Sequence, residues 1–576
     1  MKFDELKKYV KQAFKGKISI THGMIMALIL VAGMYTQVYA DTTVYDSSDS
    51  PIIVTGTGNT AINNGTVDFI GDYGMKAEDG AEIINNGNVI NDGMYGMYAY
   101  SYSTANNYGN VENDGDFGMD ATNNSIVDNY DTVMNTGNTG MRATYYSTAN
   151  NYGTIINNGV YGMDAYSYST ANNYGTIMNN GWYGIHAYSH SMADNYGTVK
   201  NNGDFGITAI YNSTATNYGT IMNNGWYGMY ADGLYDPPLP STINNYGIIK
   251  NDGDYGMYAY SHSTADNYGT VKNGGDYGMR ATYYSTANNY GTIKNSGDYY
   301  GMGATYYSTA NNYDTVINTG NTGMGATYYS TVNNYGTVKN NGWYGMYAGP
   351  YSTANNYGII KNGEAYGMDT YNGTANNYGT VMNTGNTGMK ATNYGVANNY
   401  SIVKNGGDYG MLAYLYGTAI NETEGTIENG GNYRMHAQGV GAEAENCGTL
   451  DTGFKGYTVM MGTYDGTITN NGIIDVDHDY GVAMYVESGA KAVNKGTINL
   501  NGKNGIGMHA IGPLATIENH GTINLSGTQV NEGEPVGHTD GITGDTFMGK
   551  DSRGNIGMKI ESGAKMINKG KIVFSD

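Results

Sequence analysis

A repeat of about 22 residues sets the strongest limit on how this chain of 576 residues can fold. The nine residues STANNYGTI occur three times without change, beginning at Ser147, Ser169 and Ser285. When the residue before the Gly of each NYG-like element is taken as an anchor, sixteen anchors run from Asn64 to Tyr400. Twelve of the fifteen intervals between them are 22 residues. Recurrence at a fixed spacing is typical of a stack of equivalent units, not of a single catalytic centre.

Alternation inside each repeat predicts short strands. The residue three positions after each Tyr anchor is Val or Ile, the next is variable, and the one after that is Asn, as in Ile155, Ile156 and Asn157. This period of two is the pattern of a half-buried strand. A further run around Ala149 and Asn151 completes the repeat before the next anchor.

Another alternating run follows the turn after Asn157. The position of Met163 holds Met or Ile in the other repeats, which predicts a core position. The position of Asp164 varies widely and holds His186 and His436 in two other repeats, so we expect it to face water.

Three short strands per repeat and glycine-rich corners predict an all-β fold, a right-handed parallel β-helix (solenoid) with about 22 residues per coil. A β-propeller needs about 40 residues per blade, and the Leu signature of leucine-rich repeats and the nine-residue calcium repeat are missing. The 89 glycines argue against long helices, and the 40 % hydrophobic content with periodic aromatics argues against disorder. About twenty coils at roughly 4.8 Å each make a rod on the order of 100 Å long.

The N-terminus differs in composition from the repeats. A lysine-rich start is followed by the apolar run Met24 to Met34 and by the small-residue site Val38-Tyr39-Ala40, which predicts an extended signal peptide over residues 1–40. We expect an exported chain with an N-terminal cap at 41–60 and regular coils at 61–420, interrupted by a loop near 232–241. Residues 421–576 are predicted to form longer, irregular coils with a loop near 527–554.

The charge of the chain argues against nucleic-acid binding, and its cysteine content excludes an internal disulfide. The net charge of −22 opposes binding to nucleic acid. Cys447 is the only cysteine, so no disulfide can form within the chain, and we interpret it as a tolerated substitution in one repeat, not as a nucleophile.

Asparagine and tyrosine recur at positions where their side chains would stack. The Asn before each anchor and the Asn five residues after it predict two hydrogen-bonded ladders. By strand parity Asn151 and Ile155 share the inner face, so Tyr152 points outward. We therefore predict an exposed tyrosine row, either a structural stack or an amphipathic binding stripe. Its members are Tyr108, Tyr130, Tyr152, Tyr174, Tyr196, Tyr218, Tyr246, Tyr268, Tyr290, Tyr313, Tyr335, Tyr357, Tyr378 and Tyr400.

The sequence predicts no catalytic, cofactor or metal site. The densest group of reactive side chains is Asp475, Asp477, His478 and Asp479, and paired carboxylates serve some polysaccharide-cleaving β-helices. In so acidic a chain we interpret it as an acidic turn, because no basic or nucleophilic partner is identifiable. The recurring NDGD turns, such as Asn113 to Asp116, are interpreted as solvated corners, and the nine histidines show no metal-ligand spacing.

The lysine-rich signal region followed by long NxGTIxNxG…GM repeats, most clearly NKGTINLNGKNGIGMHAIG from Asn494 to Gly512, resembles the passenger regions of type V autotransporters of Gram-negative bacteria. The resemblance covers residues 61–576 and implies display at the outer membrane or release from it, commonly in adhesion, aggregation or biofilm. The sequence departs from that family because it contains no alternating amphipathic strands for a translocator β-barrel.

We therefore expect a non-enzymatic, surface-exposed or secreted solenoid that acts in adhesion, autoaggregation or as a structural spacer. Its expected partners are host or neighbouring-cell surface molecules, matrix, or further copies of itself. The alternative is a carbohydrate-active β-helix enzyme, a polysaccharide lyase or hydrolase, which would interrupt its repeats to build a cleft. The repeats run nearly unbroken from 61 to 420, which favours the adhesin.

Overall fold

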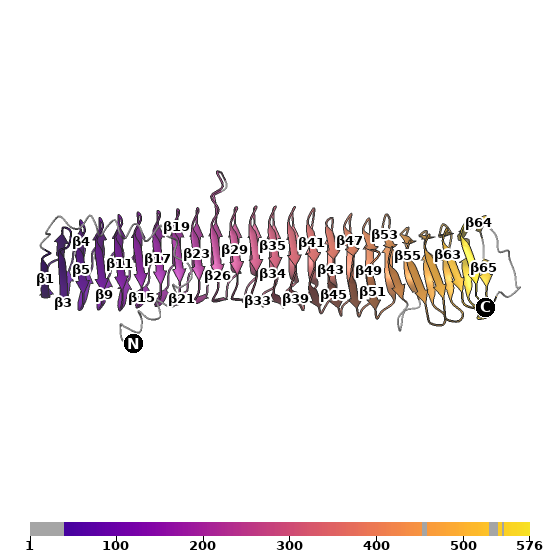
Figure 1. The fold of residues 1–576 in the computed structure, drawn as a ribbon, viewed down its shortest axis with the longest axis horizontal. Coiled ribbons are helices and arrows are strands. Elements are labelled where there is room, and N and C mark those ends of the chain that lie inside the picture. The colour runs from indigo at the N-terminus through magenta and orange to yellow at the C-terminus, as the bar shows by residue number, and fades with distance from the viewer. Residues whose placement is uncertain (1–39, 235, 452–457, 529–538, 544–545, 576) are drawn as a thin grey trace, which may run out of the picture.

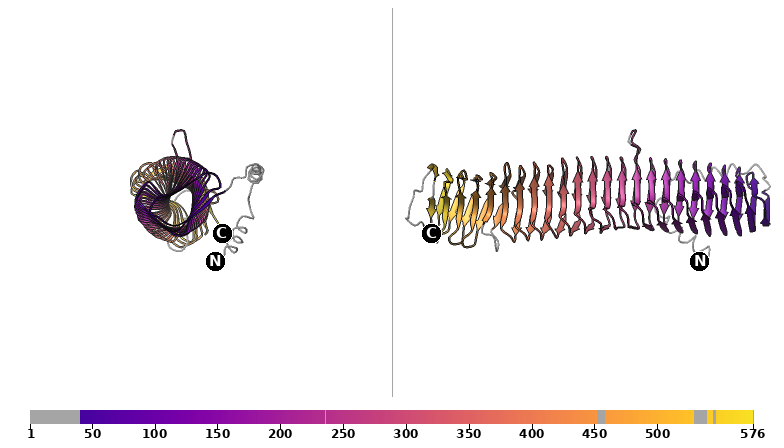
Figure 2. Two further views of the ribbon diagram at one scale, coloured as in Figure 1. Left: turned by 90° about the vertical axis from the view of Figure 1, so that its left-hand side faces the viewer. Right: turned by 180° about the vertical axis from the view of Figure 1, so that it is seen from behind.

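The chain forms a long, nearly straight rod of stacked coils (Figure 1). A computed structural model describes residues 40–234, 236–451, 458–528, 539–543 and 546–575, and residues 1–39 of the expected signal peptide lie outside these ranges. All regular elements of the described chain are strands, β1 to β68. No helix in the described ranges is long and apolar enough to cross a membrane. Seen along the axis, the coils superimpose on one closed outline (Figure 2).

One coil consists of three strands, shown here for the coil that begins with the first STANNYGTI. They are β14 (Thr148–Asn151), β15 (Thr154–Asn157) and β16 (Tyr161–Tyr166), which we take to define the first, second and third faces of the rod. Each pairs in parallel with the strand 22 residues later, β17 (Thr170–Asn173), β18 (Thr176–Asn179) and β19 (Tyr183–Tyr188). The predicted all-β parallel solenoid of about 22 residues per coil is confirmed.

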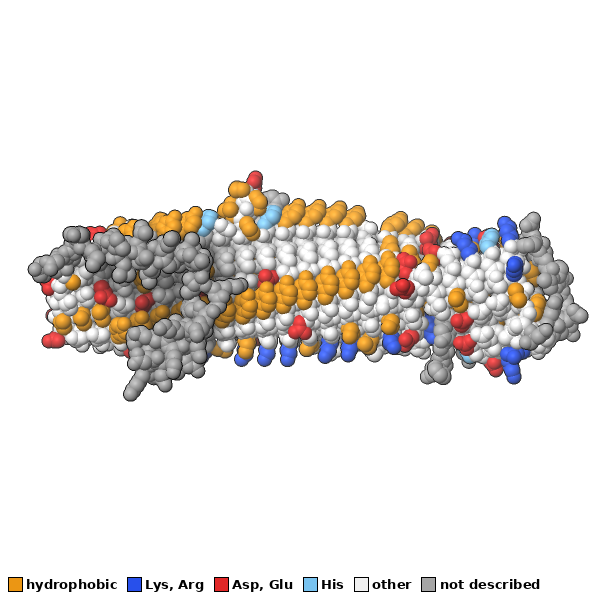
Figure 3. Space-filling model, viewed as in Figure 1, with side chains coloured by type: hydrophobic (Ala, Val, Ile, Leu, Met, Phe, Trp, Pro, Cys, Tyr) orange, Lys and Arg blue, Asp and Glu red, His pale blue; other side chains and the backbone are white. Residues whose placement is uncertain are grey.

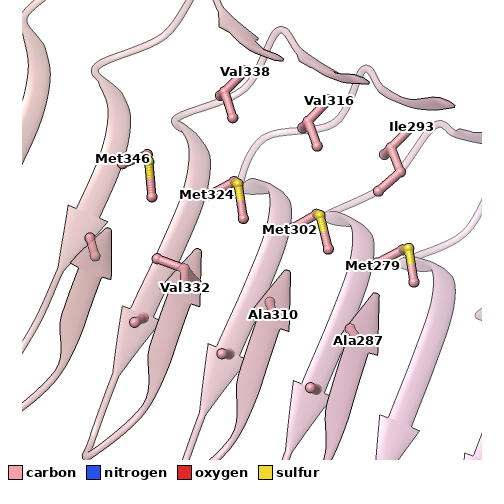
Figure 4. Packing of buried hydrophobic residues seen from close by; sticks show 14 of the residues in the cluster. Met279, Ala287, Ile293, Met302, Ala310, Val316, Met324, Val332, Val338 and Met346 are labelled. Atoms are coloured by element: carbon pink, nitrogen blue, oxygen red, sulfur yellow. The ribbon is translucent and has the colours of Figure 1, made fainter. Parts of the chain in front are cut away.

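Apolar side chains of equivalent positions stack inside the rod. Ala149, Ile155, Met163 and Ala165 are fully buried, as the alternation predicts. Figure 4 shows the same arrangement further along, where methionines line up from coil to coil beside a line of Val and Ile. Each coil buries its apolar face against its neighbours, so packing between adjacent coils holds the rod together.

Both predicted asparagine ladders are confirmed. In the first ladder the Nδ2 of Asn151 donates to the Oδ1 of Asn173 at 2.8 Å, and in the second Asn157 donates to Asn179 at 2.8 Å. These side chains are buried, and an amide buried without a hydrogen-bond partner would cost free energy. The ladder avoids this cost because each amide bonds to the amide of the next coil. A third, outward row occurs on the first face, where Asn172 donates to Asn150 at 2.8 Å.

The expectation that the Asp164 position faces water is wrong. His186 and His436 are 8 % and 4 % exposed, and Asp120, at the same position of another coil, is fully buried. The strand does direct these side chains away from the core, but the larger aromatic side chains at neighbouring positions extend beyond them and cover them. His186, for example, lies within ring contact of Tyr161 and Tyr183 on one side.

The corner between the third face and the next coil has an unusual backbone. Two consecutive residues adopt positive φ, as in Tyr145 (52°) and Tyr146 (63°), and most residues at these corners are not glycine. Such a conformation costs free energy in an L-residue. Hydrogen bonds between coils offset part of the cost, since Tyr146 N donates to Ser167 O at 3.2 Å and Ser147 N to Ser169 Oγ at 3.2 Å.

The proline-containing insertion leaves the stack unchanged. It lies between β25 (Tyr227–Asp232) and β26 (Thr242–Asn245), and a single bridge between Leu234 and Leu239 holds its base. Figure 1 shows it as a projection from the side of the rod. The inner ladder continues past it, because Asn217 still donates to Asn245 at 2.8 Å.

The C-terminal coils end in strands that run in the opposite direction. The described part of the expected 527–554 loop includes β64 (Thr539–Thr543) and β65 (Thr546–Lys550). They pair antiparallel with β67 (Lys565–Asn568) and β66 (Ile556–Glu561), respectively. Two faces of the last coil therefore have their outer edges covered.

Candidate binding surfaces

The fourteen predicted tyrosines, which we call the anchor row, lie on the outside of the rod at the corner between the first and second faces. From Tyr108 to Tyr378 each is 41–49 % exposed, and Tyr400 at the end is less exposed. Neighbouring rings stack with centroids 4.6–5.1 Å apart and planes within 10° of each other. Space filling shows such side chains as long lines parallel to the rod axis (Figure 3).

The stacking determines what the anchor row presents to a partner. Each ring face is occupied by the next ring, so ring edges and phenolic hydroxyls form the outer surface. Partial burial raises the pKa of Tyr152 and of Tyr196 to about 12, with further upward effects from Asp128 on Tyr152 and from Asp194 on Tyr196. The row is therefore an uncharged, amphipathic strip at neutral pH, and its tips can donate and accept hydrogen bonds.

Two more aromatic rows accompany the anchor row and were not predicted. The corner row occupies the second positive-φ position, and its successive rings lie 4.6–5.1 Å apart where they stack. In the sequence this row corresponds to the tyrosine that precedes STA in the recurring segments YYSTA and YSYSTA. Its members are Tyr102, Tyr146, Tyr168, His190, His262, Tyr284, Tyr307, Tyr329, Tyr351, Tyr394 and Tyr416.

The third-face row begins each strand of the third face and is more buried. Its rings stack 4.8–5.8 Å apart, and Thr139, Thr322 and Thr387 interrupt it. It consists of Tyr73, Tyr95, Phe117, Tyr161, Tyr183, Phe205, Tyr227, Tyr255, Tyr277, Tyr300, Tyr344, Tyr366, Tyr409 and Tyr433.

Charged side chains are exposed on the second face of the rod and enclosed on the third. Exposed lysines follow one another on the second face, and Figure 3 shows a line of basic side chains along one edge of the rod. On the third face charges are instead enclosed by the rings. Arg142 holds Asp120 by two hydrogen bonds of 2.9 Å, and His186 Nδ1 lies 2.8 Å from Asp164. The lysines of the second-face line are Lys200, Lys250, Lys272, Lys294, Lys339, Lys361 and Lys404.

The acidic group in IIDVDHDYG has its carboxylates engaged with the next coil. Asn499 Nδ2 donates to Asp475 at 2.7 Å, Asn501 Nδ2 to Asp477 at 2.7 Å, and the backbone N of Lys503 to Asp479 at 2.8 Å. These contacts continue the pattern of hydrogen bonds between coils found elsewhere in the rod. Within the described ranges, no three His, Cys, Asp or Glu side chains are grouped so as to hold a metal ion.

Cys447 occupies the anchor position of its coil, between Asn446 and Gly448. Its Sγ is partly buried and lies 3.7 Å from a carboxylate oxygen of Glu445. Burial and this carboxylate raise the pKa of the thiol, which keeps it in the protonated, less nucleophilic form.

A family model described as the BigA third pectate lyase-like domain matches residues 329–546. This segment is less than half of the chain, and it includes the last regular coils and the more irregular ones that follow. No curated protein matches the chain. The chain is thus a parallel β-solenoid repeat protein with a segment similar to that pectate lyase-like domain.

Proposed function

We propose that this chain is a non-enzymatic rod, displayed on a cell surface or released from it, that adheres to neighbouring cells or matrix through its anchor row. The unbroken anchor row carries the proposal. Thirteen intervals at roughly 4.8 Å make a strip on the order of 60 Å long. A contiguous exposed aromatic surface of this size is typical of an interaction site.

The nearly unbroken repeats from 61 to 420 support a binding role over a catalytic one, because an enzyme of this fold would interrupt its repeats to build a cleft. The carboxylates of Asp475, Asp477 and Asp479 each bind a group of the next coil, so they are used in holding coils together. The alternative, a carbohydrate-active enzyme, predicts that the purified chain cleaves polysaccharides. Cleavage of any member of a polysaccharide panel would overturn the non-enzymatic proposal.

The adhesive role is tested by replacing Tyr174, Tyr196 and Tyr218 together with Ser in cells that display the full chain. Retention on matrix-coated plates and clumping of the cells are measured. We expect a decrease of about tenfold or more, because tyrosine is enriched among the interface residues whose truncation costs about 2 kcal/mol or more. Circular dichroism of the purified variant should match wild type, since the rings lie outside the core.

A matched control replaces Lys200, Lys250 and Lys272 with Ser on the second face, where all three are exposed. This variant removes large side chains from nearby coils and should adhere as wild type does. Unchanged adhesion of the tyrosine variant would contradict the proposal, and equal losses in both variants would assign the effect to general surface change.

A further inference from the structure

Two consecutive coils lack a side chain at the outward position of the third face. In register along the rod, this position is occupied by Tyr258, Arg280, Gly303, Gly325 and Tyr347. They lie on β28 (Tyr255–Tyr260), β31 (Tyr277–Thr282), β34 (Tyr300–Thr305), β37 (Thr322–Thr327) and β40 (Tyr344–Ala348). The two glycines line a cavity of about 220 Å³, and the coils on either side carry the large side chains Arg280 and Tyr347 at this position.

Aromatic rings form both long walls of this cavity. On one side Tyr277 and Tyr300 stack 5.3 Å apart, and on the other Tyr306 and Tyr328 stack 5.0 Å apart. Tyr300 leans over the floor, since a Cβ added to Gly325 would lie 2.3 Å from its Cε1. The hydroxyls of Thr305 and Thr327 lie at the same edge, 3.4 Å apart.

Thr322 interrupts the third-face row beside the cavity. At most positions of this row a ring is followed by another ring, which covers its face. After Tyr300 the next position is Thr322, so among the described residues Tyr300 stacks on Tyr277 alone. The cavity is thus a place where an aromatic face can be offered to a ligand.

Arg280 lines the end of the cavity without a carboxylate partner in the described chain. Its Nη1 donates to Tyr255 Oη at 3.0 Å, and its guanidinium lies 4.6 Å from the centre of the Tyr277 ring. Its Nε is buried with no hydrogen-bond partner among the described residues. Asp276 influences it electrostatically, but no ion pair joins the two.

Arg142 shows which chemical group the Nε and Nη2 edge of a guanidinium binds at this position of a coil. It occupies the equivalent position in another coil, and its Nε and Nη2 each donate at 2.9 Å to one oxygen of Asp120. A guanidinium presents this edge to carboxylates in a planar, bidentate geometry. The residues in register with Arg280 on the two neighbouring coils are Tyr258 and Gly303, and neither supplies a carboxylate.

We propose that this cavity binds one carboxylated sugar ring at the end or a branch of a glycan. Arg280 takes the carboxylate, the free face of Tyr300 contacts the apolar face of the sugar ring, and Thr305 and Thr327 bind its hydroxyls. The volume lies below the roughly 300 Å³ at which pockets for larger ligands begin, so it suits a single ring. The proposal rests on the adhesive function above and names the chemical class that one of its contacts recognises.

The test is isothermal titration calorimetry of the purified full chain with glucuronic acid and with N-acetylneuraminic acid, with glucose as the neutral comparison. Wild type should bind at least one acid and bind glucose more weakly. Arg280→Leu should weaken binding of that acid by about ten- to a hundredfold, as expected for a lost charge-assisted hydrogen-bond pair. Leu412 stands at the same position of another coil and is 7 % exposed, so the fold accommodates this side chain.

Gly303→Leu fills the cavity and should abolish binding while leaving the circular dichroism spectrum unchanged. An ideal Cβ there meets Tyr277 at an ordinary contact distance of 3.4 Å. The control Lys294→Leu removes the same charge from an exposed site on the second face and should bind as wild type does.

The proposal is overturned if wild type binds neither acid, if glucose binds as tightly as the acids, or if Arg280→Leu binds like wild type. Which acid binds identifies the kind of glycan. The tyrosine variant of the anchor row should retain full affinity for the acid, so a failure of this site and a failure of the adhesive anchor row give different results.

Discussion

Asp369 is a carboxylate enclosed where most coils carry an uncharged or paired side chain. It lies on β43 (Tyr366–Tyr371), is 6 % exposed, and its Oδ1 has no hydrogen-bond partner among the described residues. Burial raises its pKa from 3.8 to about 6, and the positive charge of Lys390 offsets only part of this effect. The folded chain therefore holds the Asp369 proton more tightly than the unfolded chain does.

Replacing Asp369 with Asn should stabilise the protein at pH 8 and leave it unchanged near pH 4. The stabilisation from the protonated carboxyl is fully present below about pH 3.8 and is lost as the pH rises through about 6. A shift of about two units corresponds to roughly 3 kcal/mol in the ionised state. Thermal unfolding at both pH values measures the effect. Asp252→Asn, in an exposed turn, is the control, and an equal gain at both pH values would contradict the assignment to Asp369 ionisation.

At the same scale, strand parity predicted which way most side chains point, and it failed where neighbouring rings matter. Ile155 and Asn151 are buried as predicted, and Tyr152 is exposed. His186 was misplaced because alternation gives the direction of a side chain, not the height of the rings beside it. The cavity at Gly303 and Gly325 was also missed, since it depends on the lean of Tyr300 over a position with no side chain.

The strands are short, and their ends are held by the ladders. A strand of four residues has little stability alone, so each depends on the coils before and after it. The inner ladder at Asn195 illustrates this dependence. It accepts from Asn173 and donates to Asn217, both at 2.7 Å, and also donates to Gly197 O at 3.2 Å.

Asn195→Ala should lower the free energy of unfolding by about 1–3 kcal/mol, because buried groups of both neighbours lose their partner. Hydrogen exchange should increase in strands β17, β20 (Met192–Asn195) and β23 (Thr214–Asn217), and less in coils further away. The control is Asn202→Ala, whose amide forms the same kind of bond to Asn180 at the surface. If both variants lose equal stability, burial is not the reason that the inner ladder stabilises the rod.

Strands, ladders and the anchor row could be predicted because sixteen repeats show which positions tolerate change. The tyrosines of the corner row also recur in the sequence, but their backbone geometry could not be predicted, because two successive residues of positive φ are not a conformation that tyrosine prefers. Their geometry depends on hydrogen bonds to the next coil, which become visible only once the coils are stacked. The antiparallel strands β64 and β65 were missed for a similar reason, since they lie outside the repeat.

At the scale of the whole molecule, the stability of the rod is approximately a sum over its coils, because each coil contacts mainly the coil on either side. Its length can therefore change by whole coils without disturbing the rest. The insertion between β25 and β26 likewise leaves the neighbouring coils in place, because it projects from the side while the ladder continues.

Deleting residues 169–190, one full coil, should shorten the rod by roughly 4.8 Å and leave its melting temperature within a few degrees of wild type. Small-angle X-ray scattering and circular dichroism measure length and stability. Deleting residues 169–179 instead removes half a coil, places core residues out of register, and should unfold the neighbouring coils. A half-coil deletion as stable as the full-coil deletion would refute the nearest-neighbour description.

The reversed strands β64 and β65 have a consequence for how copies of the rod meet. A bare parallel edge is a template on which an identical molecule can polymerise end to end, as in a fibril. Because β65 and β64 pair antiparallel with β66 and β67, the outer edges of β66 and β67 are not open for parallel pairing with a coil of another copy. We therefore expect any contact between copies to form along the sides of the rod, where the aromatic rows lie, and not through these two edges.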